Sequence, residues 1–138
     1  MPVTACVAYV AIGANLGDPV ATVRAAIEAL RGIADTRFLR ASSLYRTAPV
    51  GLHHQPDFIN AVAALEVAPA VLPALTLLER LFAIEASFGR VRTVKNAPRT
   101  LDLDLLLFGD QRLDQPGLTL PHPRMAERAC VLAPRAEA

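Results

Sequence analysis

Hydrophobic residues recur along this chain with two different periods, which divide it into strands and helices. Short runs rich in Ala, Val, Ile and Leu predict strands, and apolar residues spaced three and four apart predict amphipathic helices. The first helix has Asp18 as its N-cap and Pro19 at its first position, and it stops at Gly32. The strands are expected at residues 6–12, 37–46, 58–67 and 99–108, and the helices at residues 19–32 and 73–88.

Along the chain these elements follow the order strand, helix, strand, strand, helix, strand. That order predicts an α+β fold, a ferredoxin-like βαββαβ sandwich in which both helices pack on one face of a mainly antiparallel sheet. Arg112 and Leu113 are expected to begin a C-terminal hairpin, and residues 124–132 a short helix. The whole chain, residues 1–138, is expected to form a single domain.

The strand at residues 99–108 carries two carboxylates, Asp102 and Asp104, among leucines. Side chains two residues apart in a strand share one side, roughly 6.5–7 Å apart, while the intervening leucines face the opposite layer. Two like charges this close repel, and burying them uncompensated costs several kcal/mol. Mg²⁺ would compensate them, since it is commonly held by one or two carboxylates together with substrate phosphates. The alternative is an antiparallel strand whose polar face is simply solvated.

A basic segment immediately before this strand favours the magnesium interpretation. Arg90, Arg92, Lys95 and Arg99 lie there, and no acidic residue occurs within residues 86–101. Arginine binds phosphate through two parallel hydrogen bonds, and cations stabilise the charge that develops during phosphoryl transfer. A basic loop leading into a paired-carboxylate strand is therefore suited to hold a polyphosphate and its metal ions.

Three polar residues elsewhere allow two interpretations each. Asn60, in an otherwise apolar strand, could read a flat heterocycle or satisfy a neighbouring backbone group. Glu85, on or near the apolar stripe of the second helix, lies either at the rim of that stripe or paired with an arginine. His122, between two prolines, is either a phosphate donor or a buried neutral histidine.

Composition narrows the class of protein. The chain has 138 residues, is 53% hydrophobic and carries a net charge of +1, which favours a globular protein over a general nucleic-acid binder. No basic region followed by a long apolar core begins the chain, and no uncharged run is long enough to cross a membrane. Cys6 and Cys130 form no Cys-x-x-Cys motif, so reduced thiols are expected. These features predict a cytoplasmic protein with no membrane or nucleic-acid partner. A monomer is the default expectation, because no helix face looks like an obvious dimer seam.

Six segments of the chain carry a resemblance to a known family. The most specific is Pro98-Arg99-Thr100-Leu101-Asp102-Leu103-Asp104. The others are residues 11–17, 43–51, 55–60, 88–92 and 120–125. Together, and in this order, they closely resemble the 6-hydroxymethyl-7,8-dihydropterin pyrophosphokinases of folate biosynthesis. The resemblance extends over nearly the whole chain.

The resemblance implies that pyrophosphate is transferred from ATP to the hydroxymethyl group of 6-hydroxymethyl-7,8-dihydropterin, which yields AMP and the pterin diphosphate. It implies two Mg²⁺ ions on Asp102 and Asp104, with ATP as co-substrate. Arg90 and Arg92 would lie on a loop that closes over the site, and they would act in catalysis together with the two aspartates.

Two further groups of residues are implied to bind the substrates. The ATP-binding residues would be Glu85, Arg92, Arg99, Thr119, His122 and Arg128. The pterin-binding residues would be Thr47, Ala48, Val50, Phe58, Asn60 and Cys130. Cys130 stands where members of the family usually place an aromatic residue that stacks on the pterin.

Two other functions stay open at this point. One is a related protein that has lost turnover and serves as a nucleotide-binding or regulatory module, an alternative suggested by Cys130. The other is an ATP-dependent pyrophosphoryl transferase that uses the same metal strand on a different acceptor. Formation of AMP from Mg-ATP with and without the pterin distinguishes all three functions.

Overall fold

The computed structural model describes residues 4–48, 56–89 and 101–123 of the chain. The elements in these ranges are β1 (Cys6–Ala14), α1 (Pro19–Arg31), β2 (Thr36–Ala41), β3 (Tyr45–Thr47), β4 (Phe58–Val67), α2 (Ala74–Ser87), β5 (Asp102–Phe108), β6 (Leu113–Gln115) and β7 (Leu118–Leu120). The short helix expected at residues 124–132 lies outside the described residues.

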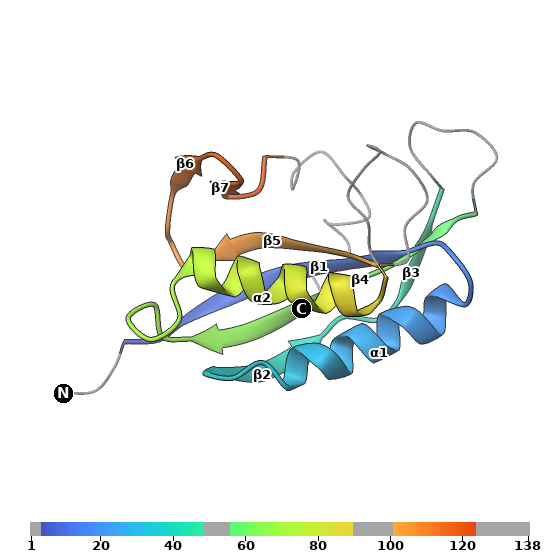
Figure 1. Cartoon of the computed structure of the whole chain (residues 1–138), viewed down its shortest axis with the longest axis horizontal. Coiled ribbons are helices and arrows are strands. Elements are labelled where there is room, and N and C mark those ends of the chain that lie inside the picture. Colours follow the sequence, from blue (N-terminus) through green and yellow to red (C-terminus); the bar gives the residue numbers. More distant parts are fainter. Residues whose placement is uncertain (1–3, 49–55, 90–100, 124–138) are drawn as a thin grey trace.

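Five strands form one antiparallel sheet in the order β2-β4-β1-β5, and β3 continues along the β2 edge of β4. Figure 1 shows α1 and α2 on the same side of this sheet. The predicted ferredoxin-like α+β fold is therefore confirmed. The predicted C-terminal hairpin is also present: β6 pairs with β7, and the hairpin lies on the β5 side of the sheet.

The first helix has the capping pattern that the sequence predicts. The Asp18 carboxylate accepts a hydrogen bond from the Ala21 N–H at 3.1 Å, and Pro19 occupies the first helical position. At the other end, the Gly32 N–H donates to the carbonyl of Ala29. These bonds satisfy backbone groups that a helix end would otherwise leave unpaired.

The sequence predicts an apolar face of the second helix through Leu75, Leu78, Leu81, Phe82 and Ile84, but a different stripe faces the core. Leu78 and Leu81 are buried as predicted, but Leu75 is 45% exposed and Phe82 is 40% exposed. The helix turns 100° per residue, and its buried line runs through Ala74, Leu77, Leu78, Leu81 and Glu85. Leu75 and Phe82 therefore lie on a flank of the helix, outside the packed face.

The single strand expected at residues 37–46 is wrong, because the chain leaves the ladder at Ser42. The Ser42 N–H donates to the Val62 carbonyl, but the Val62 N–H donates to the Ser42 hydroxyl at 3.0 Å. The hydroxyl thus replaces a backbone acceptor, and the strand divides into β2 and β3. Ser42 is only 6% exposed, so it does not belong to the wetter face that the sequence Ser42-Ser43-Leu44-Tyr45 suggests for this strand.

β5 divides its side chains between two layers, as the alternation predicts. The helix side receives the buried Leu101, Leu103, Leu105 and Phe108. Asp102 and Asp104 are only partly buried and lie on the other face. Leu106 is an extra residue in the ladder with β1, and it packs with Val62 in a second, small cluster on the carboxylate side. The carboxylate face is therefore apolar around Val62 and Leu106 and polar towards the start of β5.

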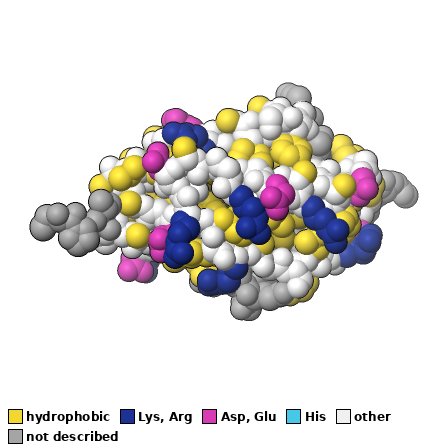
Figure 2. All heavy atoms as spheres, turned by 90° about the horizontal axis from the view of Figure 1, so that it is seen from below, with side chains coloured by type: hydrophobic (Ala, Val, Ile, Leu, Met, Phe, Trp, Pro, Cys, Tyr) yellow, Lys and Arg dark blue, Asp and Glu magenta, His cyan; other side chains and the backbone are white. Residues whose placement is uncertain are grey.

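The face on the side of α1 and β2 mixes positive and negative side chains (Figure 2). Arg31 lies 3.3 Å from Glu28, and Arg37 lies 3.2 Å from Glu66. Exposed pairs of this kind contribute little to stability, so they mark a solvated surface. Neither α1 nor α2, the helices within the described ranges, is long and apolar enough to cross a membrane.

Candidate active site

Cross-strand pairing places polar residues from three strands in one row across the sheet. Gly13 of β1 pairs with Asn60 of β4 on one side and with Asp102 of β5 on the other. Directly paired residues share a face of the sheet. Since neighbouring strands lie about 4.8 Å apart, the backbones of Asn60 and Asp102 are roughly 9.6 Å apart. Asp104 lies in the adjacent row, where it pairs with Ala11.

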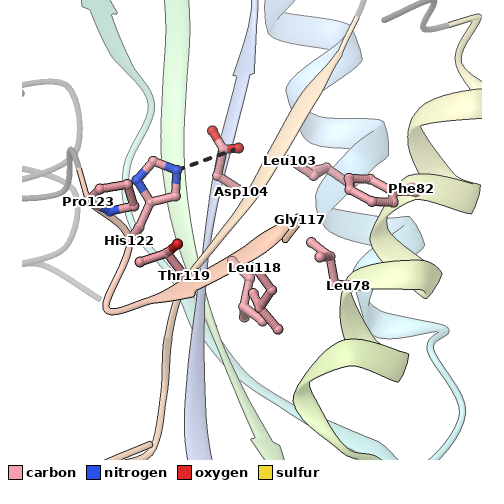
Figure 3. Close-up of a pocket in the computed structure, with 10 residues that line it drawn as sticks. Leu78, Phe82, Leu103, Asp104, Gly117, Leu118, Thr119, His122 and Pro123 are labelled. Atoms are coloured by element: carbon pink, nitrogen blue, oxygen red, sulfur yellow. Dashed lines mark ion pairs between the residues drawn. The ribbon is translucent and has the colours of Figure 1, made fainter. Parts of the chain in front are cut away.

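A histidine approaches the carboxylates from the segment that follows β7. The backbone N–H of His122 donates to the Leu106 carbonyl at 2.8 Å, and this bond fixes the segment against β5. The His122 Nε2 then lies 4.0 Å from Oδ1 of Asp104, within ion-pair distance when the imidazole is protonated (Figure 3). Both side chains keep part of their surface accessible, 27% for His122 and 39% for Asp104. The imidazole can therefore contact a bound anion, and the carboxylate can contact a bound cation.

A cleft of about 330 Å³ opens between α2, β5 and β7 beside Asp104. Its polar lining comes from Asp104, Thr119 and His122, which Figure 3 shows on one side of it. Its apolar lining includes Leu78, Phe82, Leu103, Leu105 and Leu118. A cleft whose wall combines apolar side chains with a few polar groups is typical of a small-molecule site. Thr119 and His122, both expected to bind ATP, thus face the same cleft as one of the carboxylates.

Of the two interpretations of Glu85, the one at the rim of α2 is wrong, because the side chain is buried. Its pairing with an arginine stays a prediction. Glu85 is 1% exposed, and its Oε2 accepts a hydrogen bond from the Leu103 N–H at 2.7 Å. Leu103 lies between Asp102 and Asp104 on β5, which is an edge strand of the main sheet. The buried carboxylate therefore satisfies an edge N–H and fixes the backbone that carries both aspartates. Glu85 is not part of the cleft lining.

Three residues predicted to bind the pterin gather at the opposite edge of the row. Thr47 of β3 pairs directly with Phe58 of β4, and the Asn60 Nδ2 donates to the Thr47 Oγ1 at 2.7 Å. Ala48 follows directly and is exposed. The side-chain amide of Asn60 therefore bonds a neighbouring hydroxyl, which differs from the backbone role considered as its simpler alternative. An amide, a hydroxyl and an aromatic ring together suit a flat, polar heterocycle.

Sequence reasoning missed Asn15, which bonds the chain just before Phe58 and so supports the residues predicted to bind the pterin. It is 1% exposed, and its Nδ2 donates to the Pro56 carbonyl at 3.2 Å, just before β4 begins. It also missed Leu78, Phe82 and Leu118 in the cleft. The available signal for Asn15 was its place in the matching segment 11–17, whereas the cleft residues look like ordinary core positions in the sequence.

Comparison with known proteins identifies the family. The family model described as 7,8-dihydro-6-hydroxymethylpterin-pyrophosphokinase matches residues 9–138. The chain belongs to this family. Three relatives are named 2-amino-4-hydroxy-6-hydroxymethyldihydropteridine pyrophosphokinase, and they come from Pseudomonas aeruginosa, Pseudomonas putida and Haemophilus influenzae.

The three pyrophosphokinase relatives are similar over most of this chain. The Pseudomonas aeruginosa protein is 48% identical over 129 residues, which is 94% of this chain and 78% of that protein. The Pseudomonas putida protein is 50% identical over 118 residues, 86% of this chain and 95% of its own length. The Haemophilus influenzae protein is 42% identical over 127 residues, 92% and 78% of the two chains.

Several residues expected in a pyrophosphokinase site lie outside the described residues. They are Val50, Arg90, Arg92, Arg99, Arg128 and Cys130. The described part of the site therefore consists of the two carboxylates, the cleft and the group expected to bind the acceptor. We call this group the acceptor edge; it comprises Thr47, Ala48, Phe58 and Asn60. The expected closing loop and the expected pterin wall at Cys130 stay predictions.

The donor set on β5 fits magnesium. Within the described ranges, no group of three or more His, Cys, Asp and Glu side chains is arranged to enclose a metal ion. Asp102 and Asp104 instead offer carboxylate oxygens on one accessible face of the sheet. Mg²⁺ favours this arrangement, because it keeps several waters and takes its remaining ligands from substrate phosphates.

Glu85 gives a test of how the carboxylate strand is held. Glu85→Ala should lower the free energy of unfolding by about 2 kcal/mol, because it leaves the buried Leu103 N–H without its acceptor. Glu85→Gln keeps an acceptor oxygen and should recover part of this loss. Urea unfolding followed by circular dichroism measures both variants. An alanine variant as stable as the wild type would show that this hydrogen bond does not fix β5.

Proposed function

We propose that this chain transfers the pyrophosphoryl group of ATP to the hydroxymethyl group of 6-hydroxymethyl-7,8-dihydropterin, in tetrahydrofolate biosynthesis. The observation that carries the proposal is the row Asn60–Gly13–Asp102, which puts the Asn60 amide and the Asp102 carboxylate on one face of the sheet. The activity for which the relatives are named agrees with it. Such a site brings the acceptor hydroxyl near the phosphates and removes much of the entropic cost of their meeting.

The nucleotide is proposed to occupy the cleft beside β5. Its apolar wall suits the base, and Thr119 and His122 can donate hydrogen bonds to ribose or phosphate oxygens. Asp102 and Asp104 would hold Mg²⁺, two ions in our proposal, with the triphosphate as the other ligand. The metal would neutralise phosphate charge and orient the attacking and leaving oxygens. The buried Glu85 supports this by fixing the strand between the two aspartates.

The pterin is proposed to lie at the other end of the row. Asn60 and Thr47 would bond its polar edge, Phe58 would contact its ring face, and Ala48 would border it. The bond between Asn60 and Thr47 fixes the amide in one orientation before the substrate arrives. Preorganised polar groups discriminate strongly against a ring that cannot pair with them.

The reaction is an in-line displacement at the β-phosphorus of ATP. The hydroxymethyl oxygen forms a bond to that phosphorus and loses its proton, while the bond from the phosphorus to the α,β-bridging oxygen breaks. AMP leaves with the bridging oxygen, and the pterin diphosphate forms. Arg90, Arg92, Arg99 and Arg128 are proposed to take up the charge that spreads over the phosphate oxygens.

The direct test is AMP formation from Mg-ATP with and without 6-hydroxymethyl-7,8-dihydropterin. We expect AMP and the pterin diphosphate in equal amounts, and AMP only when the pterin is present. ATP binding without AMP would instead indicate the nucleotide-binding module. AMP formed only with another acceptor would indicate the second transferase. Either result would contradict the proposal.

The metal assignment is tested by neutralising each carboxylate. Asp102→Asn and Asp104→Asn should each lower kcat by about a thousandfold or more, because an amide cannot balance the cation charge. Thermal unfolding should be nearly unchanged, since the leucines on the helix side of β5 are untouched. Asp114→Asn, at an exposed position of β6, is the matched control and should keep the wild-type rate. Near-wild-type kcat in either site variant would refute the assignment.

A further inference from the structure

Between the acceptor edge and the carboxylates, the floor of the site is formed by β1, where Gly13 has no side chain. Gly13 is buried within a regular strand and is not among the glycines with positive φ. Its backbone conformation is therefore open to any residue. A requirement for glycine at position 13 would therefore come from the absence of a side chain, and not from the conformational freedom of glycine.

A side chain at position 13 would contact residues of the acceptor edge directly. A Cβ on Gly13 would lie 3.2 Å from Oδ1 of Asn60 and 4.0 Å from Cδ1 of Phe58. The first distance is tighter than ordinary van der Waals contact, so the amide would have to move by a few tenths of an ångström. The second distance is an ordinary contact. The predicted conflict is thus with the amide oxygen alone.

The orientation of that amide explains why a small displacement matters. Its Nδ2 donates to the Thr47 Oγ1 at 2.7 Å, and this bond turns Oδ1 towards Gly13 and the middle of the sheet. A carbonyl oxygen in this position can accept a hydrogen bond from a ring N–H or an exocyclic amino group, and a pterin carries both. Moving Oδ1 would strain the hydrogen bond to Thr47 or shift the oxygen away from the N–H groups of the pterin.

We propose that Gly13 is a positioning residue of the acceptor site, whose missing Cβ keeps the Asn60 carbonyl oxygen in place to accept an N–H of the dihydropterin. The proposal rests on the proposed function, because it names a determinant of the same acceptor site. Gly13 acts on acceptor binding and leaves nucleotide binding to the cleft, which Gly13 does not line.

The test compares Gly13→Ala with Gly32→Ala. Gly32 caps α1 at a φ of −91°, and a Cβ there would meet only the Ala29 carbonyl, at 3.5 Å. Gly13→Ala should lower kcat/KM for the dihydropterin about tenfold, through KM, because a displaced hydrogen-bonding group binds poorly. Its dissociation constant for Mg²⁺ with a non-hydrolysable ATP analogue should stay within about twofold of the wild type, as should every constant of Gly32→Ala.

Three results would overturn the proposal. One is a dihydropterin kcat/KM for Gly13→Ala that equals that of Gly32→Ala. Another is an equal loss of nucleotide affinity in Gly13→Ala, which would mean general damage to the fold. The third is additivity in a double-mutant cycle, in which Gly13→Ala lowers kcat/KM by the same factor with and without Asn60→Ala. The proposal predicts instead that, once Asn60→Ala has removed the amide, adding Gly13→Ala lowers kcat/KM by less than about twofold.

Thermal unfolding gives an independent readout that does not need activity. The double variant Gly13→Ala, Asn60→Ala should melt no lower than Asn60→Ala, because the 3.2 Å contact is gone. A lower melting temperature would place the conflict elsewhere and contradict the proposal, even if the single variant Gly13→Ala does not fold. The wild-type AMP assay decides the proposed function separately, so the two failures remain distinguishable.

Discussion

The site depends on two carboxylates being held two residues apart on one edge strand. Asp102 and Asp104 repel each other, and they stay side by side because Leu101, Leu103 and Leu105 anchor the opposite side of the strand in the core. The buried Glu85 adds a second constraint by accepting the Leu103 N–H from the helix side. A third carboxyl group, that of Glu85, therefore supports the strand from the helix side, in a layer that the sheet separates from the two accessible aspartates.

The order of strands turns this local arrangement into a two-substrate site. β1 runs between β4 and β5, so residues far apart in the sequence become neighbours in one row. Asn60 and Asp102 lie two strand spacings apart, with only Gly13 between them. The β6–β7 hairpin and the segment after it add Thr119 and His122 beside Asp104, and together with α2 they line the cleft. The fold supplies the spacing, and a few side chains supply the chemistry.

Much of this could be predicted from local patterns, and the failures share one cause. The bounds of β4, the cap of α1 and the alternation on β5 follow from residues close in sequence. The break at Ser42 does not, because a hydroxyl replaces a backbone acceptor from the neighbouring strand. The same holds for Glu85, whose burial depends on an N–H eighteen residues away, and for Phe82, whose exposure depends on what packs beside α2. Contacts between elements decided each of these.

The central claim is that the metal carboxylates and the acceptor amide share one face of the sheet. Replacing Mg²⁺ by Mn²⁺ with a non-hydrolysable ATP analogue, and measuring NMR relaxation enhancement, tests it directly. We predict strong broadening of the Gly13 backbone amide and the Asn60 side-chain amide, with the Gly32 amide at the far end of α1 unaffected. Sharp signals from Gly13 and Asn60 in the presence of bound Mn²⁺ would contradict it.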